Sequence, residues 1–224
     1  MLGGTSSIGS SFLRILALEG IATLATCRTR GSEQQASETQ WLELDLASRN
    51  SCERFALEIR SIGFRYVVLF IGALSVKEGK PLADLQEVED YVTAYVARYI
   101  WVLDAILSAT EPAPLRLLHV SSRASRYGSW DQYYSASKSA MEAALRSFVR
   151  KHSNRVEALS VATGLIEGSK MALSFSSSGL ESHRTRSENS LWDVKELSDS
   201  LKKVLFDQKL DWDGRVIELG PSYE

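Results

Sequence analysis

The chain opens with the glycine-rich stretch Leu2-Gly3-Gly4-Thr5-Ser6-Ser7-Ile8-Gly9, which runs directly into a segment of helical periodicity. Small residues let the backbone turn sharply at the end of a strand and approach a pyrophosphate, which the first amides of the next helix then bind. Gly3 and Gly9 occupy the ends of that pattern. The residues between them that add hydroxyls and amides, or begin the helix, are Thr5, Ser6, Ser7 and Ile8. The stretch indicates a dinucleotide-binding turn, and a plain strand-to-helix turn is the alternative interpretation.

After this turn, apolar runs of strand length alternate with helical patterns, which is typical of stacked βαβ units. We expect an α/β fold with a Rossmann-type, doubly wound parallel sheet, formed by a single domain over residues 1–224. The predicted strands are Ile21–Thr26, Trp41–Leu44, Tyr66–Ile71, Leu115–Val120, Arg155–Val161 and Arg215–Leu219. The predicted helices are Ile8–Glu19 (closed by Gly20), Ser51–Ile62 (closed by Gly63), Leu85–Ser108, Tyr133–Lys151 and Val194–Phe206.

The first strand of this predicted sheet is truncated. Only Met1 and Leu2 precede the glycine turn, where a dinucleotide-binding fold has a full central strand. Either the native start lies upstream, or the chain tolerates a short central strand at a cost in buried apolar area.

Composition and charge exclude several classes of function. Against 28 acidic residues stand 26 basic ones, and the net charge of −2 creates no field that favours nucleic acid or anionic membrane. The apolar stretch Tyr66–Val76 is too short to span a bilayer, and the amino terminus has no secretory pattern. Cys27 and Cys52 lack metal-ligand spacing, so we expect two buried free thiols and no metal. These features predict a cytoplasmic protein without nucleic-acid or membrane partners.

The end of the second predicted strand, Thr26-Cys27-Arg28-Thr29-Arg30, is the place where such folds distinguish the two nicotinamide cofactors. A carboxylate there binds the free ribose 2′-hydroxyl, whereas a guanidinium accommodates a 2′-phosphate. No acid is present and two arginines are, so NADP (NADPH) is favoured over NAD. Solvated surface arginines are the alternative.

The stretch Tyr134-Ser135-Ala136-Ser137-Lys138 places a phenol and an ammonium one turn apart on one face of a predicted helix. A free phenol has a pKa of about 10 and is a poor base at neutral pH. A nearby ammonium lowers that pKa, so the tyrosine can exchange a proton with a substrate oxygen. The pair Ser121-Ser122, at the end of the preceding strand, offers a hydroxyl for the same oxygen.

In their order and spacing, these motifs resemble those of the short-chain dehydrogenase/reductase family, in its short single-domain form, over nearly the whole chain. The resemblance implies that Ser122 orients the substrate, Tyr134 is the catalytic acid/base and Lys138 binds the nicotinamide ribose hydroxyls. Ser121 is the alternative serine, because the gap from Ser122 to Tyr134 is one residue shorter than is common in the family.

The resemblance extends to the rest of the cofactor site. Asp45-Leu46 matches the adenine-contacting Asp of the family, Gly72 falls in its Asn-Ala-Gly segment, and Asp213–Ile217 resembles its last strand. The segment with Gly164 and Ile166 corresponds to the one that contacts the nicotinamide carboxamide.

Several residues depart from the family pattern. Ser7 replaces the middle glycine of the turn, and Phe70 lies where the family has Asn. The family also has a helix asparagine that takes part in a proton relay. Leu85–Ser108 contains no asparagine, so that residue is replaced near Ala94. Loss of that residue is expected to slow proton delivery without removing the tyrosine. After the fifth strand, Thr163-Gly164 occupies the position where the family has Pro-Gly. The threonine that normally follows is Gly168, with Ser169 as a possible substitute.

Two further expectations concern segments around this site. The Ser-rich segment Ala172–Ser190 is interpreted as a substrate lid, or else as an ordinary surface loop. The helices Leu85–Ser108 and Tyr133–Lys151 pair with their copies in the family, which predicts a homodimer or a homotetramer. A monomer that buries their bulky apolar residues internally is the alternative. Those residues are Tyr91, Tyr95, Trp101, Met141, Leu145 and Phe148.

The resulting hypothesis is an NADP-dependent oxidoreductase that reduces a ketone, or oxidises a secondary alcohol, by hydride transfer coupled to proton exchange at Tyr134. Looser similarities favour a keto-sugar or a 3-oxoacyl substrate. The alternative is a non-catalytic nucleotide-sensing or assembly subunit that retains the fold. His119, in the strand before the serines, is interpreted as a packed strand residue rather than a catalyst.

Overall fold

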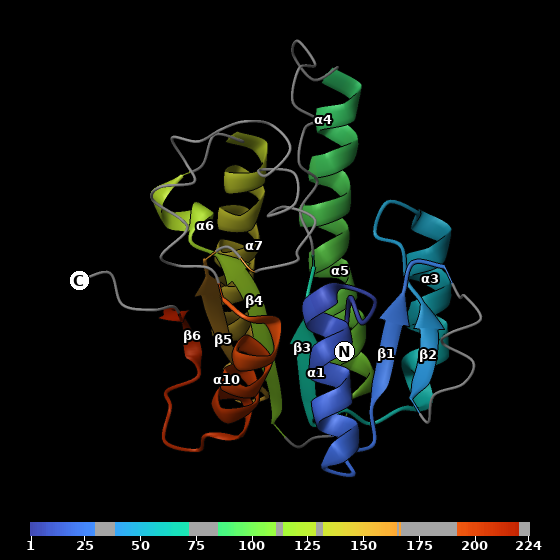
Figure 1. Cartoon of the computed structure of the whole chain (residues 1–224). Coiled ribbons are helices and arrows are strands. Elements are labelled where there is room, and N and C mark those ends of the chain that lie inside the picture. Colours follow the sequence, from blue (N-terminus) through green and yellow to red (C-terminus); the bar gives the residue numbers. More distant parts are fainter. Residues whose placement is uncertain are drawn as a thin grey trace.

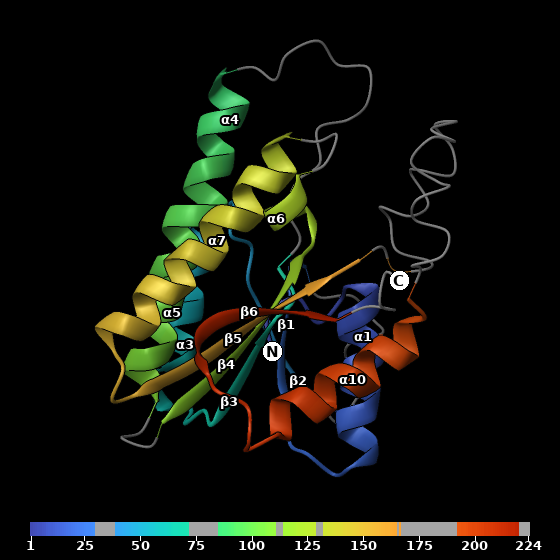
Figure 2. The ribbon, with the colours of Figure 1, turned by 90° about the vertical axis from the view of Figure 1, so that its left-hand side faces the viewer.

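A parallel sheet with helices on both faces forms the centre of the molecule (Figures 1 and 2). The structure, a computed structural model, describes residues 1–29, 39–71, 85–110, 114–128, 132–164, 166 and 192–219. All four paired strand ladders are parallel, as the alternating sequence pattern predicts. The strands are β1 Leu24–Cys27, β2 Gln40–Glu43, β3 Tyr66–Leu69, β4 Leu115–Ser122, β5 Val156–Thr163 and β6 Asp213–Leu219.

Met1 and Leu2 lie between β1 and β3 and join two ladders into one sheet. On one side, Thr26 N donates to Met1 O at 2.9 Å, and Gly4 N donates to Thr26 O at 2.9 Å. On the other side, Leu2 N donates to Val68 O at 2.8 Å, and Phe70 N donates to Leu2 O at 2.9 Å. The strand order is therefore β2-β1-(Met1–Leu2)-β3-β4-β5-β6, that of a doubly wound Rossmann-type sheet.

The helices divide between the two faces of the sheet (Figure 2). On one face, α1 (Ser7–Leu18) and α10 (Val194–Phe206) cover a core that includes Leu118 and Val120. The opposite face is covered by α3 (Arg49–Glu58), α5 (Arg98–Ala109) and α7 (Gln132–Lys151), over a core that includes Leu115 and Leu117. Because both faces are buried, the strands read as continuous apolar runs. The remaining elements are α4 Leu85–Val92, α6 Ala124–Tyr127, a 3₁₀ turn Ile59–Ser61 and a π-helical turn Thr93–Ala97.

Gly20 ends α1, as the sequence predicts, but the strand that follows begins later than predicted. Gly20 has a φ of +67°, its N–H donates to Ala17 O, and Ile21 N donates to Leu16 O. This pair of bonds is a Schellman motif, which uses Ile21 to close the helix. The strand consequently starts at Leu24 rather than Ile21.

The predicted helix Leu85–Ser108 is interrupted. A π-helical turn over Thr93–Ala97 separates α4 from α5, which is a correction to the single helix expected from periodicity. A π turn inserts an extra residue into the helix and occurs often at functional sites. Here it buries Ala94 and Tyr95, near the position where the sequence lacks the relay asparagine.

Most of the bulky residues that suggested an interface are buried within a single chain. Tyr95, Met141, Leu145 and Phe148 are all buried, so they give no support to pairing between copies. Of the described side chains in that set, Trp101 is exposed.

Three other expectations can be compared with the structure. Cys27 and Cys52 are buried free thiols, as predicted. The suggested lid Ala172–Ser190 lies outside the described residues. Among the helices that the structure describes, none combines the length and apolarity needed to cross a membrane.

Candidate active site

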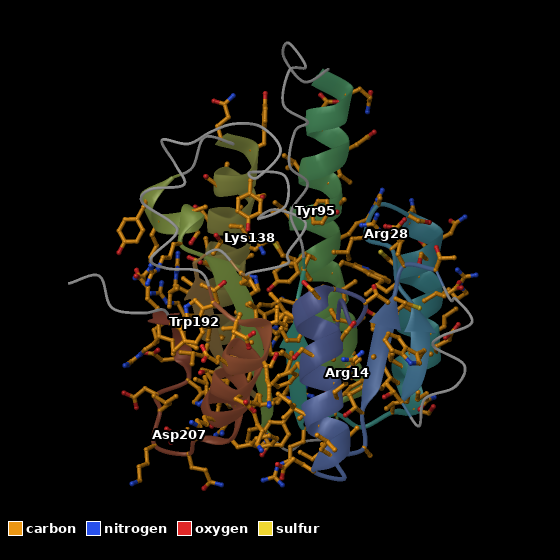
Figure 3. The ribbon with its side chains drawn as sticks, viewed as in Figure 1. Arg14, Arg28, Tyr95, Lys138, Trp192 and Asp207 are labelled. Atoms are coloured by element: carbon orange, nitrogen blue, oxygen red, sulfur yellow. The ribbon has the colours of Figure 1, made fainter. Side chains whose placement is uncertain are left out.

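The predicted site residues gather at the edge of the sheet where the strands end. Figure 3 shows Lys138, Tyr95 and Arg28 along this edge, whereas Asp207 lies at the opposite end of the molecule. Because the carboxyl ends of parallel strands share one edge, residues far apart in the sequence meet here. This is where open α/β sheets bind their ligands.

The glycine turn is packed too tightly to accept side chains at two of its positions. Gly3 has a φ of +80°, and a Cβ there would lie 2.1 Å from the carbonyl oxygen of Phe70. A Cβ on Gly9 would lie 2.4 Å from Gly3 O and 2.8 Å from Ser6 Oγ. The backbone of this turn therefore lies directly against the end of β3 and the start of α1.

Ser6 fixes the start of α1. Its Oγ accepts a hydrogen bond from Gly9 N at 3.0 Å and donates to Gly3 O at 2.9 Å. A helix begins with amides that have no acceptor within the helix, and here these belong to Ser7 and Ile8. Together with the exposed hydroxyls of Thr5 and Ser7, these amides form a donor set suited to a pyrophosphate. The turn thus fits a dinucleotide.

Arg28 and Asp45 lie together at the ends of β1 and β2. Arg28 Nε is 3.9 Å from Asp45 Oδ1, and 73% of the Arg28 side chain is exposed. Asp45 Oδ1 also accepts from Ala47 N at 3.0 Å, and the adjacent Leu46 is buried. The exposed guanidinium can meet an anionic group from solvent, in competition with its contact to Asp45. Arg30, the second predicted arginine, lies outside the described residues.

Tyr95 faces this corner from the π turn. Its side chain is buried, and burial raises its pKa, an effect that Arg28 opposes and Asp45 reinforces. The π turn therefore presents a tyrosine to Arg28 and Asp45, a feature that periodicity cannot predict.

Lys138 links α7 to the end of β3. Its ammonium donates to the carbonyl oxygen of Ile71 at 2.7 Å and lies 5.9 Å from the centroid of the Tyr134 ring. Tyr134 is half-buried, whereas Lys138 is buried. The predicted helical spacing of the two residues is therefore correct, and the phenol ring and ammonium are neighbours.

Burial lowers the pKa of Lys138 to about 8, and the negative charge of Glu142 opposes this effect. An ammonium in a low-dielectric site exerts a stronger field than one in water, but it loses its proton more readily. The charge on this side chain is thus sensitive to its neighbours near neutral pH.

The two serines of β4 have different partners. Ser121 is buried, and its Oγ donates to Glu142 Oε1 at 2.5 Å. Ser122 is half-buried at the end of the strand, and its Oγ accepts from Ala124 N at 3.2 Å, at the start of α6. Side chains alternate along a strand, so the two hydroxyls point to opposite faces. Since Ser121 is held by Glu142, Ser122 is the better placed of the two for a ligand.

Glu142 was not predicted as a site residue. It lies four residues beyond Lys138 on α7, so the helical spacing that selected Lys138 from Tyr134 also selects Glu142. A carboxylate at that spacing, on a face that must be buried, is the signal that could have found it.

His119 is a buried strand residue, as predicted. Its Nδ1 is 3.3 Å from Ser160 Oγ, and its ring packs 6.1 Å from that of Tyr99. Burial, with a smaller contribution from Lys138, lowers the pKa of His119 to about 3. The ring is therefore neutral at physiological pH.

The predicted carboxamide segment is described only in part. Gly164 is half-buried directly after β5, and Ile166 is buried and forms an isolated bridge with Trp192. Gly72, Gly168 and Ser169 lie outside the described residues.

Comparison with known proteins supports a dehydrogenase fold. A family model described as short chain dehydrogenase matches residues 1–178. No curated protein sequence matches the chain.

Solved structures resemble the chain over almost its full length. One is a short-chain dehydrogenase/reductase from Serratia marcescens, with 15% identity and a TM-score of 0.77, covering 97% of this chain and 94% of that one. A short chain dehydrogenase family protein from Francisella tularensis has 14% identity and a TM-score of 0.78 over the same shares. 3-Hydroxyacyl-CoA dehydrogenase type-2 from Mycobacterium avium has 17% identity and a TM-score of 0.73, covering 97% and 92%. At such identities the likeness shows the fold.

Proposed function

Because this chain belongs to the short-chain dehydrogenase/reductase family, we propose that it reduces a ketone, or oxidises a secondary alcohol, with NADP as its cofactor. Membership of the family makes it an oxidoreductase that uses a nicotinamide cofactor. The observation that carries the proposal is the Lys138 ammonium, buried beside the Tyr134 ring and bonded to the end of β3.

In this proposal, Tyr134 exchanges the proton of the substrate oxygen. The adjacent ammonium of Lys138 favours the phenolate, which lets the phenol act as acid or base near neutral pH. Ser122 holds the substrate oxygen through its hydroxyl, and Lys138 binds ribose hydroxyls. When bound, the nicotinamide would donate a hydride in the reduction or accept one in the oxidation, and the chain would position it.

The proposed cofactor residues can be grouped by the part of the dinucleotide that each would bind. Gly3, Thr5, Ser6, Ser7, Ile8 and Gly9 would hold the pyrophosphate, and Asp45 and Leu46 the adenine. Gly72, Gly164 and Ile166 would line the nicotinamide end. The preference for NADP rests on Arg28, whose exposed guanidinium can meet a 2′-phosphate at the cost of its weak contact with Asp45. In a melting experiment, NADP should therefore raise the melting temperature more than NAD at equal concentration.

Two substrate classes are proposed, keto-sugars and 3-oxoacyl compounds. The printed name of the Mycobacterium avium protein, a 3-hydroxyacyl-CoA dehydrogenase, supports the second class at the level of fold. The keto-sugar class is proposed because the glycine turn is loosely similar in sequence to that of keto-sugar reductases.

The rival function is a nucleotide-sensing or assembly subunit without turnover. The absence of asparagine from Leu85–Ser108 favours it, since a relay residue for proton delivery is missing. The presence of Ser122, Tyr134 and Lys138 argues against it.

The decisive experiment is NADPH oxidation by purified protein over a panel of keto-sugars, 3-oxoacyl thioesters and simple ketones. We expect turnover on at least one class, and a loss of at least ~100-fold in Tyr134→Phe with cofactor affinity retained. Cofactor binding without turnover on any compound, and no effect of the substitution, would support the sensor instead. If neither NADP nor NAD raises the melting temperature, both hypotheses are contradicted, because each assumes that a nicotinamide cofactor binds.

The remaining proposals concern the whole chain. We propose that residues 1–224 form one NADP-binding domain, which predicts a single cooperative unfolding transition that shifts with NADP. We further propose a cytoplasmic homodimer or homotetramer.

A further inference from the structure

Glu142 is a buried carboxylate in the middle of α7. Its side chain is 4% exposed, and its Oε1 accepts from Ser121 Oγ at 2.5 Å and from Ser125 Oγ at 2.6 Å. Such short hydroxyl–carboxylate bonds are charge-assisted and stronger than bonds between neutral groups. A buried acid is costly unless it is bonded in this way, so its presence needs an explanation.

The first explanation is the turn that carries Ser122. Ser125 Oγ lies 2.7 Å from Ser122 O, and Ser139 Oγ donates to Ser125 O at 2.6 Å. Through Ser121 on one side of Ser122 and Ser125 on the other, Glu142 therefore ties the end of β4 and the start of α6 to α7. This places the Ser122 hydroxyl relative to the helix that carries Tyr134.

The second explanation is the charge on Lys138. Among the described residues, the titratable groups that interact with this ammonium are Tyr134 and Glu142 of α7 and His119 of β4, and Tyr99 of α5 packs against the His119 ring. The ammonium also donates to the carbonyl of Ile71, in the segment that follows β3. The carboxylate of Glu142 is the charge that counters the cost of burying the ammonium.

We propose that Glu142 is a positioning residue of the active site: one turn beyond Lys138 on α7 and bonded to two serine hydroxyls, its carboxylate holds the Ser122 turn against that helix and balances the charge of the buried ammonium. The inference rests on the proposed function, because it assumes that Lys138 acts as an ammonium. It adds a fourth side chain to the Ser122, Tyr134 and Lys138 set.

Glu142→Gln separates charge from hydrogen bonding. Both hydroxyls donate to the same oxygen, so a glutamine can keep both bonds through its carbonyl oxygen while losing the charge. Without the carboxylate, Lys138 should lose its proton at a lower pH. We expect the high-pH limb of kcat/KM for NADPH, and of NADPH affinity, to shift down by about 1 pH unit. The control is Glu58→Gln, which removes a carboxylate at an exposed position of α3. It should leave the pH of the high-pH limb unchanged.

Ser121→Ala and Ser125→Ala remove one hydrogen bond each and keep the charge. They should lower kcat several-fold at every pH without moving the limb, because they loosen the turn alone. Glu142→Asp keeps the charge and should keep the limb at the wild-type pH.

A readout independent of turnover distinguishes failure of this inference from failure of the proposed function. The ¹³Cε shift of Lys138, in protein labelled with ¹³C-lysine and assigned with Lys138→Arg, reports its ionisation directly. The shift should titrate at lower pH in Glu142→Gln than in wild type, whether or not any substrate is turned over. Titration at the same pH in both proteins would overturn the inference even for an active enzyme. If Glu142→Gln does not fold, unchanged kcat in both serine variants would overturn it instead.

Discussion

At the scale of single residues, Gly3 and Gly20 form a matched pair. Both have positive φ angles, of +80° and +67°, but only Gly3 is packed against another backbone. Gly20→Ala should cost about 1–2 kcal/mol, the penalty of a left-handed conformation. Gly3→Ala adds a collision with Phe70 O and should cost at least ~3 kcal/mol. Urea unfolding at fixed pH measures both, and equal losses would show that the packing at Gly3 is not tight.

The residues of the site were predictable where a spacing carries the chemistry. Tyr134 and Lys138 follow from a four-residue interval on a helix, and the glycine turn follows from small residues before a helical pattern. The different surroundings of Ser121 and Ser122 were not predictable, because they depend on Glu142, whose contact with Ser121 spans 21 residues. The position of Tyr95 near Arg28 and Asp45 was not predictable either, because it depends on a π turn.

At the scale of elements, the start of α1 should couple helix stability to cofactor binding. Ser6 caps α1 through Gly9 N, and Asp193 caps α10 on the same face through Lys195 N and Glu196 N. Each alanine substitution should lower the free energy of unfolding by about 1 kcal/mol. Ser6→Ala should also weaken NADP binding several-fold, because the amides that face the pyrophosphate lose their fixed geometry. Asp193→Ala should leave binding unchanged.

Calorimetry with and without NADP tests the comparison. If both variants lost NADP affinity equally, the effect would reflect general destabilisation rather than a change in the glycine turn and the start of α1.

Element types were predictable, and their exact ends were not. Every predicted strand and helix has a counterpart, since buried strands and amphipathic helices leave strong patterns. Boundaries moved where local capping decides, as at Gly20. The break at Thr93–Ala97 has no periodic signature, and α6 begins where Ser122 Oγ accepts from Ala124 N, a contact that helical propensity does not predict.

At the scale of the whole molecule, the proposed self-association now depends on a smaller surface than the sequence suggested. Val92, Ile100 and Trp101 are exposed by 51%, 36% and 43% on α4 and α5. Trp101→Glu should therefore reduce the mass measured by light scattering from that of a dimer or tetramer toward 24.9 kDa. Leu57→Glu, at an exposed leucine of α3, is the matched control and should leave the assembly intact. A wild-type protein already at 24.9 kDa would contradict the proposed assembly.

The fold itself was the most predictable property at this scale. Two residues, Met1 and Leu2, hydrogen-bond on both sides and still complete the central position of the sheet. Backbone groups supply these bonds, so the pairing does not depend on the side chains of Met1 and Leu2. The sequence alone could not show that Met1 and Leu2 would hydrogen-bond to the ladders on both sides.

In the proposed mechanism, the buried ammonium of Lys138 makes Tyr134 a proton donor and acceptor. Titration of the tyrosine by difference absorbance, in protein saturated with NADP, measures this most directly. The signal that is lost in Tyr134→Phe should ionise at a lower pH in the wild-type protein than in Lys138→Met. If that signal titrates at the same pH in both proteins, the ammonium does not activate the phenol and the account is wrong.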